Sequence, residues 1–241
     1  MDNPSSVTTT LDAAAFDVDT SDGGRRRILH PVTLNLPEHR IAVIGANGSG
    51  KSTLLRLIAG LVAPSSGSVQ LSPTGLRTGF IFANPQAQLI MPVVGEDIAF
   101  SLRSSISSAA QRRQRSREIL DTMGLGDREE SSIYDLSSGE RQKVALAGVL
   151  AAEPELVLAD EPTTLLDLRS TVEFTEMLMN LTPPMIVATH DLDLAARAQR
   201  VLVFDDGHLV ADGPPSVAIP HYRELAGGGG GDLSTPQKPD Q

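Results

Sequence analysis

The stretch Gly45-Ala46-Asn47-Gly48-Ser49-Gly50-Lys51-Ser52-Thr53 is the most informative part of this 241-residue sequence. It fits the pattern G-x-x-x-x-G-K-[ST], and the residues on both sides fit the context that this pattern requires. Residues 41–44 form a continuous apolar run, as in a strand buried in a parallel sheet. Apolar residues then recur at helical spacing over residues 54–61, with Gly60 as the expected stop. The order of strand, glycine loop and helix predicts an α/β fold of the P-loop NTPase type.

The glycines of this loop allow the backbone N–H groups to turn inward around phosphate oxygens. The N-terminus of the following helix adds partial positive charge at the same place. Lys51 is expected to reach the β- and γ-phosphates of ATP, and Ser52 is expected to ligate Mg²⁺. The alternative is a chance glycine-rich turn, which the agreement of motif and flanks disfavours. All nine residues of the loop are therefore candidates for nucleotide binding.

Composition narrows the class of protein. The formal net charge of −10 argues against nucleic acid as a main partner. Without cysteine, the chain can form neither disulfides nor thiolate metal sites. No apolar run approaches the roughly 20 residues that span a bilayer, and residues 1–10 lack the apolar core of a signal peptide. We expect a protein that is soluble by itself and that meets a membrane only through a partner.

The rest of the chain predicts one domain over residues 11–225, between a disordered tail at 1–10 and a flexible Gly-rich tail at 226–241. We expect a mainly parallel sheet core, an antiparallel β subdomain and a helical subdomain at about 93–150. The predicted strands are an edge strand from Leu11 to Val18, an antiparallel strand at 28–36, a short strand at 68–71, buried strands at 79–82, 156–160 and 185–188, and a hairpin around 205–208. The three arginines at 25–27 are interpreted as a solvated loop, with phosphate contact as the alternative.

Three predicted strands end in residues that suit phosphate chemistry. The first leads into the glycine loop, the second ends in Asp160-Glu161, and the third ends in His190. Ligands of open parallel sheets bind at the carboxyl ends of the strands, so these ends are expected to converge on one γ-phosphate. Asp160 suits a Mg²⁺ ligand, Glu161 a base that orients or deprotonates water, and His190 a sensor of phosphate charge. The alternatives are an acidic helix cap and a surface or capping histidine.

Together these motifs resemble the nucleotide-binding subunit of an ATP-binding-cassette (ABC) transporter, over about residues 11–225. Leu136-Ser137-Ser138-Gly139-Glu140 resembles the family's signature L-S-G-G-Q, and Leu165-Leu166-Asp167 resembles its D-loop. The resemblance implies that Ser137, Ser138, Gly139 and Glu140 contact ATP held by the opposite subunit, with Asp167 at the dimer interface. It also implies Mg²⁺-dependent ATP hydrolysis coupled to transmembrane transport. The dimer would be a homodimer or a heterodimer with another ABC ATPase.

Three positions depart from the family pattern. Ser138 replaces a signature glycine, which is tolerable if its φ is negative. Ala83 stands where the Q-loop glutamine is expected, and Gln86 and Gln88 lie nearby but out of register. Val18 stands where an aromatic side chain usually stacks on adenine. Since valine offers only apolar contact, weak base selectivity is expected.

The segment Asn84-Pro85-Gln86-Ala87-Gln88 resembles the energy-coupling-factor (ECF) branch, whose ATPases drive uptake of vitamins and of cobalt or nickel ions. The run Gln88-Leu89-Ile90-Met91-Pro92 is most similar to the biotin-transport ATPases. This implies a membrane-embedded coupling protein, a substrate-binding membrane protein and a peripheral place on the cytoplasmic face of the cell membrane. Residues 83–100 are predicted to form an exposed groove for the membrane partner, or else to pack under the helical subdomain.

Two other functions remain open at this point. One is a soluble ABC-type ATPase that acts on DNA or ribosomes, and the other is a degenerate nucleotide-binding regulator. The single cassette and the lack of heptads between the loop and the signature weigh against the first. Intact Lys51, Glu161 and His190 weigh against the second.

Overall fold

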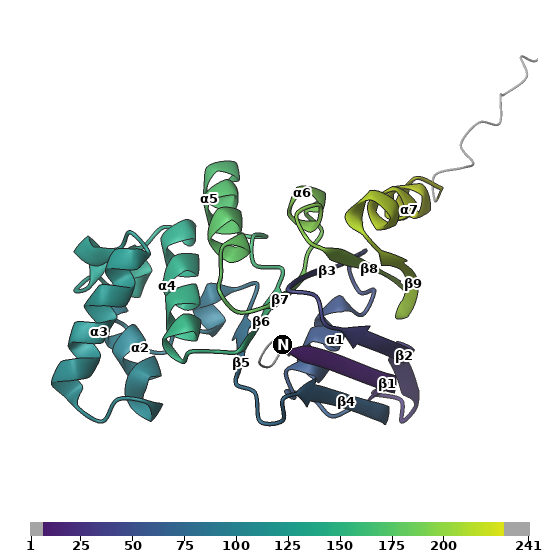
Figure 1. The fold of residues 1–241 in the computed structure, drawn as a ribbon, viewed down its shortest axis with the longest axis horizontal. Helices are drawn as coiled ribbons and strands as arrows, with labels where there is room; N and C mark the ends of the chain where they lie inside the picture. Colours follow the sequence, from purple (N-terminus) through teal and green to yellow (C-terminus); the bar gives the residue numbers. More distant parts are fainter. Residues whose placement is uncertain (1–6, 229–241) are drawn as a thin grey trace, which may run out of the picture.

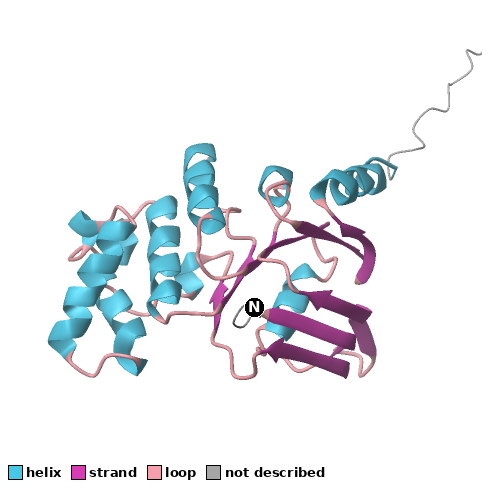
Figure 2. Ribbon diagram, viewed as in Figure 1, coloured by secondary structure: helices cyan, strands magenta, loops and turns pink. Residues whose placement is uncertain are grey.

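The computed structural model describes residues 7–228, which form two sheets and a group of helices (Figure 1, Figure 2). The larger sheet has six strands in the order β5-β6-β7-β3-β8-β9. The smaller sheet has three strands in the order β2-β1-β4. The predicted α/β class, with a mainly parallel core and an antiparallel subdomain, is confirmed.

The first five strands of the larger sheet are parallel, and only β9 runs against its neighbour. The strands are β3 (Arg40–Gly45), β5 (Thr78–Ile81), β6 (Leu156–Asp160), β7 (Met185–Ala188), β8 (Arg200–Asp205) and β9 (His208–Gly213). β3 lies between β7 and β8, and all six of its residues are buried, as the continuous apolar run predicted. β3, β6 and β7 therefore end at the same edge of the sheet, and the residues that follow each strand lie close together there.

The smaller sheet corrects two expectations. β1 (Thr8–Asp19) lies between β2 (Arg25–Leu36) and β4 (Ser66–Ser72), so the predicted edge strand is the central strand. The reason is the pairing of Leu11 with Val69, a contact far along the chain that local pattern does not reveal. Residues 8–10 belong to this strand and not to the predicted tail, whose residues 1–6 lie outside the described residues.

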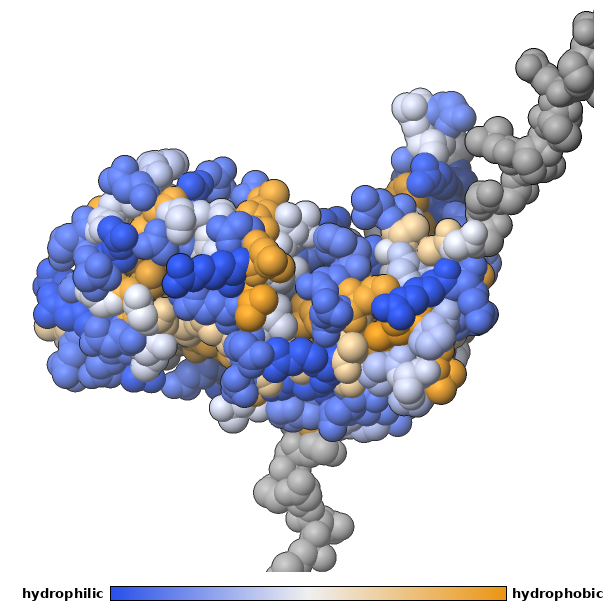
Figure 3. Space-filling view, turned by 90° about the horizontal axis from the view of Figure 1, so that it is seen from above, coloured by the Kyte–Doolittle hydropathy of each residue, from blue (hydrophilic) through white to orange (hydrophobic). Residues whose placement is uncertain are grey.

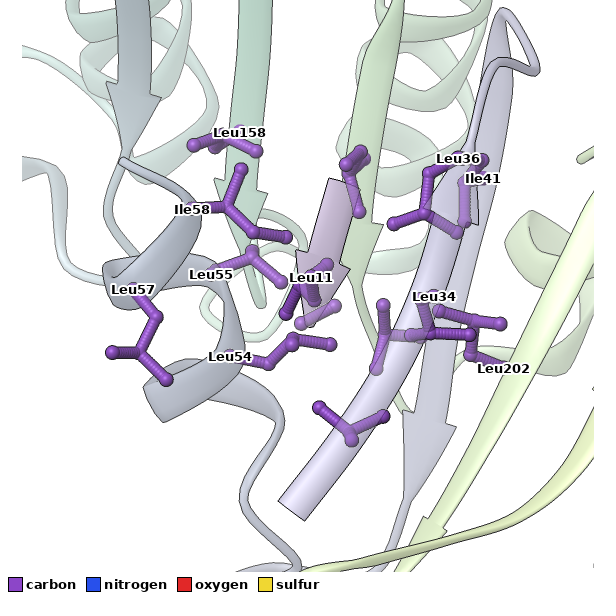
Figure 4. Close-up of a cluster of buried hydrophobic side chains, with 14 of the residues drawn as sticks. Leu11, Leu34, Leu36, Ile41, Leu54, Leu55, Leu57, Ile58, Leu158 and Leu202 are labelled. Carbon is purple, nitrogen blue, oxygen red and sulfur yellow. The ribbon is translucent and has the colours of Figure 1, made fainter. Parts of the chain in front are cut away.

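One apolar cluster joins both sheets to α1 (Lys51–Ile58). Leu54, Leu55 and Ile58 of α1 are at most 2% exposed and face Leu11 of β1 and Leu158 of β6 (Figure 4). Full burial of such a side chain is worth about 1.5–3 kcal/mol. This packing fixes the helix that follows the glycine loop, and Gly60 ends its last turn with a φ of 70°, as predicted.

The predicted helical subdomain is formed by α2 (Val94–Ser101), α3 (Ala109–Thr122) and α4 (Ser138–Ala151). These helices share a second apolar cluster, separate from the sheet, that includes Val94, Ile98, Leu120, Val144 and Ala147. Figure 1 shows them together at the left of the molecule. The subdomain places the signature segment at the start of α4.

Three helices not expected from the sequence cover the face of the larger sheet opposite α1 (Figure 1). They are α5 (Leu168–Met179), α6 (Leu192–Ala195) and α7 (Pro215–Gly228). Residues 226–228, predicted as tail, belong to α7, and residues 229–241 of that prediction lie outside the described residues. No helix within residues 7–228 has the length and apolar character needed to cross a bilayer.

Candidate nucleotide site

The glycine loop connects β3 to α1 in a backbone conformation that requires glycine. Gly45 and Gly50 have φ angles of 153° and 99°, which side chains disfavour. A Cβ atom at Gly45 would lie 2.1 Å from the carbonyl oxygen of Phe204. The close approach of β8 and the left-handed turn therefore explain the spacing of the glycines in the motif.

Lys51 begins α1 and is 5% exposed. Its Nζ donates hydrogen bonds to the carbonyl oxygens of Gly45, at 2.9 Å, and Ala46, at 3.0 Å. The same Nζ lies 3.6 Å from Oε1 of Glu161. The ammonium group is thus held at the mouth of the loop, facing the acids at the end of β6.

Ser52 and Asp160 form the second pair of the site. Ser52 Oγ donates a hydrogen bond of 2.8 Å to Oδ1 of Asp160, the last residue of β6. Burial raises the pKa of Asp160, and the hydrogen bond from Ser52 opposes that rise. A hydroxyl and a carboxylate oxygen thus lie side by side, and both are hard ligands of the type Mg²⁺ prefers.

Glu161 follows β6 in a left-handed conformation, with a φ of 50°. Its Oε2 lies 2.7 Å from Nδ1 of His190 and accepts a hydrogen bond of 3.2 Å from the hydroxyl of Thr164. Because an ionised carboxylate can only accept, Nδ1 carries the hydrogen in this pair. The structure therefore brings the ends of β6 and β7 together, as the sequence predicted.

A cavity of about 220 Å³ lies over the glycine loop. Its lining consists of residues 47–53, Glu161 and two residues of β2, Arg26 and Ile28. The predicted solvated loop at 25–27 is wrong, because these arginines begin β2. The sequence does not single out Arg26 among the three arginines, since its place in the lining depends on how β2 lies against the glycine loop.

Two polar atoms in this lining are buried and find no hydrogen-bond partner among the described residues. They are Ser49 Oγ and Glu161 Oε1. Buried polar groups are nearly always paired with protein, water or ligand. Both residues line the same cavity as Lys51 and Ser52, so a phosphate group and a water molecule bound there would satisfy the two atoms.

The signature residues do not line this cavity. Ser137 instead caps α4: its hydroxyl accepts from Glu140 N at 3.2 Å, and Glu140 Oε2 accepts from Ser137 N at 2.8 Å. The bond from the Ser137 N–H lowers the pKa of Glu140. Ser138 is the first helical residue, so its φ is negative, as its replacement of glycine requires. Gly139 is buried in the first turn of the helix.

Asp167 and Val18, the other predicted site residues, do not line this cavity either. Asp167 is exposed and caps α5 by accepting from Ser170 N at 2.8 Å. Val18 is half-buried on β1 and does not line the cavity. Gln88 does not substitute for the glutamine expected at Ala83, because its amide binds Phe82 N and the carbonyl oxygen of Ala145.

Comparisons with known proteins show the family of this chain. Residues 29–164 match the ABC transporter family. A putative ABC transporter ATP-binding protein of Deinococcus radiodurans is 44% identical over 208 residues, which cover 83% of this chain and 92% of that protein. The biotin transport ATP-binding protein BioM of Rhizobium etli is 42% identical over 211 residues, 84% of this chain and 94% of that protein.

A solved structure gives the same result for the fold. It is cbiO1 from Clostridium perfringens, described as part of the ABC transporter complex cbiONQ. The two structures agree with a TM-score of 0.75 at 27% sequence identity. The similarity covers 90% of this chain and 92% of that chain.

Proposed function

The chain belongs to the ABC transporter family and hydrolyses ATP, and from this premise we propose that it powers an ECF-type importer. The observation that carries the proposal is the 42% identity to a biotin transport ATP-binding protein over 84% of this chain and 94% of that protein. Biotin is the first candidate substrate, and cobalt or nickel ions are the second. The similarity to cbiO1, part of a transporter complex, supports the importer assignment.

In this proposal the glycine loop binds the phosphates of ATP, with Lys51 at the β- and γ-phosphates. Glu161 orients and deprotonates the water that attacks the γ-phosphate. His190 holds the Glu161 carboxylate through the 2.7 Å contact and faces the phosphate charge. The buried, unpaired Ser49 Oγ donates to a phosphate oxygen.

Ser52 and Asp160 would hold Mg²⁺. Their two oxygens lie 2.8 Å apart and are of the type that the ion prefers. Mg²⁺ typically takes only one or two protein oxygens and completes its shell with water and substrate phosphates. When bound, it would neutralise charge on the phosphates, and it would also offset the burial of the Asp160 carboxylate.

A second subunit completes the site in this proposal. The chain carries one glycine loop and one signature, and Ser137 and Glu140 do not line the cavity of their own chain. The signature of a partner, either a second copy or a related ATPase, would close over the ATP. Asp167, exposed at the start of α5, would then lie at the interface.

The segment after β5 is the proposed contact with the membrane subunit on the cytoplasmic face. Ile90 is 66% exposed. The buried carboxylate of Asp97 accepts hydrogen bonds from Ile90 N, at 2.7 Å, and Met91 N, at 2.8 Å, which fixes this turn. Val94 and Ile98 instead pack inside the helical subdomain. The segment therefore presents one apolar side chain on a rigid support.

Co-expression with the membrane proteins of its transporter tests the proposal. Cells should take up biotin, or alternatively cobalt or nickel, and Lys51→Ala should abolish uptake. Ile90→Glu should leave ATP binding intact but prevent recovery with the membrane proteins, because a charge cannot enter an apolar contact without cost. Leu61→Glu, at an exposed apolar residue outside this segment, is the matched control.

Two results would contradict the proposal. Assembly of the Ile90→Glu variant at wild-type levels would remove this segment from the interface. Recovery of the wild-type chain with DNA or ribosomes, and not with membrane proteins, would favour the soluble ABC ATPase.

A further inference from the structure

The three consecutive arginines of β2, residues 25–27, lie on two different faces of the strand and pair with residues of β1. Directly opposite residues are Asp17 with Arg27, Val18 with Arg26 and Asp19 with Arg25. Arg27 Nε lies 2.7 Å from Asp17 Oδ1, and Arg25 Nε lies 3.6 Å from Asp19 Oδ1. Because side chains alternate along a strand, Arg25 and Arg27 share one face and Arg26 points to the other.

Of these three arginines, Arg26 is the one that has no acidic partner among the described residues. Its side chain is exposed and forms no hydrogen bond or ion pair with any residue in the described range 7–228. It lines the cavity over the glycine loop together with Ile28, which lies two residues further along the same face of β2. The strand register thus places one unpaired guanidinium group in the lining of the nucleotide site.

The residues that line the cavity indicate which end holds the γ-phosphate and which end holds the nucleoside. Lys51 and Glu161 lie 3.6 Å apart, and they mark where the γ-phosphate reacts. The triphosphate runs from there along the backbone of the loop, so the nucleoside leaves the loop on the side away from β6. β2 lies on that side, because His30 N donates to the carbonyl oxygen of Gly207, at 2.9 Å, in the turn between β8 and β9. Arg26 and Ile28 are the residues of β2 in the lining.

We propose that the guanidinium group of Arg26 stacks on the base of the bound nucleotide, with Ile28 as the apolar contact beside it. This inference rests on the nucleotide site proposed above and adds the residue that reads the base. Guanidinium is planar and weakly hydrated, and it stacks on aromatic faces, unlike the compact ammonium group of lysine. Every base offers a π-face, so the contact binds ATP and GTP alike.

Calorimetric titration with Mg²⁺-ATP, Mg²⁺-GTP and inorganic triphosphate tests the contact in the full chain. Arg26→Ala should weaken both nucleotides about tenfold, or about 1.4 kcal/mol, and leave inorganic triphosphate unchanged. Arg26→Lys should lose nearly as much as Arg26→Ala, since charge without a plane does not stack. An equal loss for inorganic triphosphate, or full affinity of Arg26→Lys, would show a phosphate contact and overturn the proposal.

Arg25→Ala is the matched control, because it removes the same charge from the opposite face of the strand. It should bind both nucleotides like the wild type, and a loss equal to that of Arg26→Ala would also overturn the proposal. Adding Val18→Tyr to Arg26→Ala should restore affinity by supplying a ring at the paired position. If the wild-type chain binds no nucleotide, the proposed function itself fails. If it binds and Arg26→Ala binds equally well, only this inference fails.

Discussion

At the residue scale, Glu161 is the point where three elements of the site meet. Its two carboxylate oxygens face different groups: Oε1 faces Lys51, and Oε2 faces His190 and Thr164. The left-handed backbone at this residue turns its side chain back toward the loop, a conformation that is costly for a residue with a Cβ atom. Strain of this type persists where the surrounding structure holds it, often at functional sites.

Glu161→Gln is expected to lower the rate of ATP hydrolysis by about 10²–10⁴-fold, the typical contribution of a general base. The amide keeps the size of the side chain but cannot take a proton from water. ATP binding should persist, since Lys51 and the loop are unchanged. Phosphate release and nucleotide binding are measured on the same preparation. Turnover near the wild-type rate would remove Glu161 from the mechanism.

Among the secondary-structure elements, α4 begins with two residues that serve two purposes. Ser137 and Glu140 form a reciprocal cap that satisfies two backbone N–H groups at the start of the helix. The same residues belong to the signature that resembles a nucleotide-binding segment. The cap fixes the N-terminus of α4 in the single chain, so a partner's ATP would meet a preorganised helix end.

Ser137→Ala should therefore destabilise the protein by about 1 kcal/mol, which lowers the melting temperature by about 2–4 °C for a domain of this size. Ser138→Ala is the control, since Ser138 is exposed and supplies no cap. Equal melting temperatures of the two variants would contradict the cap.

The pH of this measurement matters because the bond from Ser137 N lowers the pKa of Glu140. A carboxyl with a lowered pKa stabilises the fold above its ordinary pKa, and the contribution is lost as pH falls through the lowered value. The melts should therefore be compared at neutral pH.

At the scale of the whole molecule, apolar side chains remain exposed beside the proposed dimer contact. Leu165 is 54% exposed, and Leu168 and Val172 at the start of α5 are 82% and 57% exposed. Figure 3 shows a band of hydrophobic residues across the middle of this face, between the helical subdomain and the sheets. Contiguous exposed apolar surface often marks a protein contact. Leu165 and Leu168 lie within two residues of Asp167 in the sequence, which agrees with the dimer in the proposed function.

Mixing two inactive variants tests whether the signature acts across that dimer. Ser137→Arg damages the signature, and Lys51→Ala damages the glycine loop. Each variant alone should be inactive, and the mixture should regain hydrolysis, because a mixed dimer keeps one undamaged composite site. A crosslink from position 137 to the partner's ATP checks the geometry directly. A mixture without hydrolysis and without that crosslink would contradict the trans assignment.

Local sequence was sufficient to predict the glycine loop and the buried strands, because each depends on residues close together in the chain. The left-handed turns need glycine at Gly45 and Gly50. The apolar run of β3 likewise predicts burial on both faces. The convergence of Glu161 and His190 also followed, since parallel strands end at one edge of a sheet.

Features that depend on pairing between distant segments could not be predicted from local sequence. The pairing of β1 with β4 made a predicted edge strand central. The register of β1 on β2 placed the side chain of Arg26 in the lining of the nucleotide cavity. Three consecutive arginines look alike in sequence. They differ in the fold because a strand alternates its faces, and because only one face of β2 meets the glycine loop.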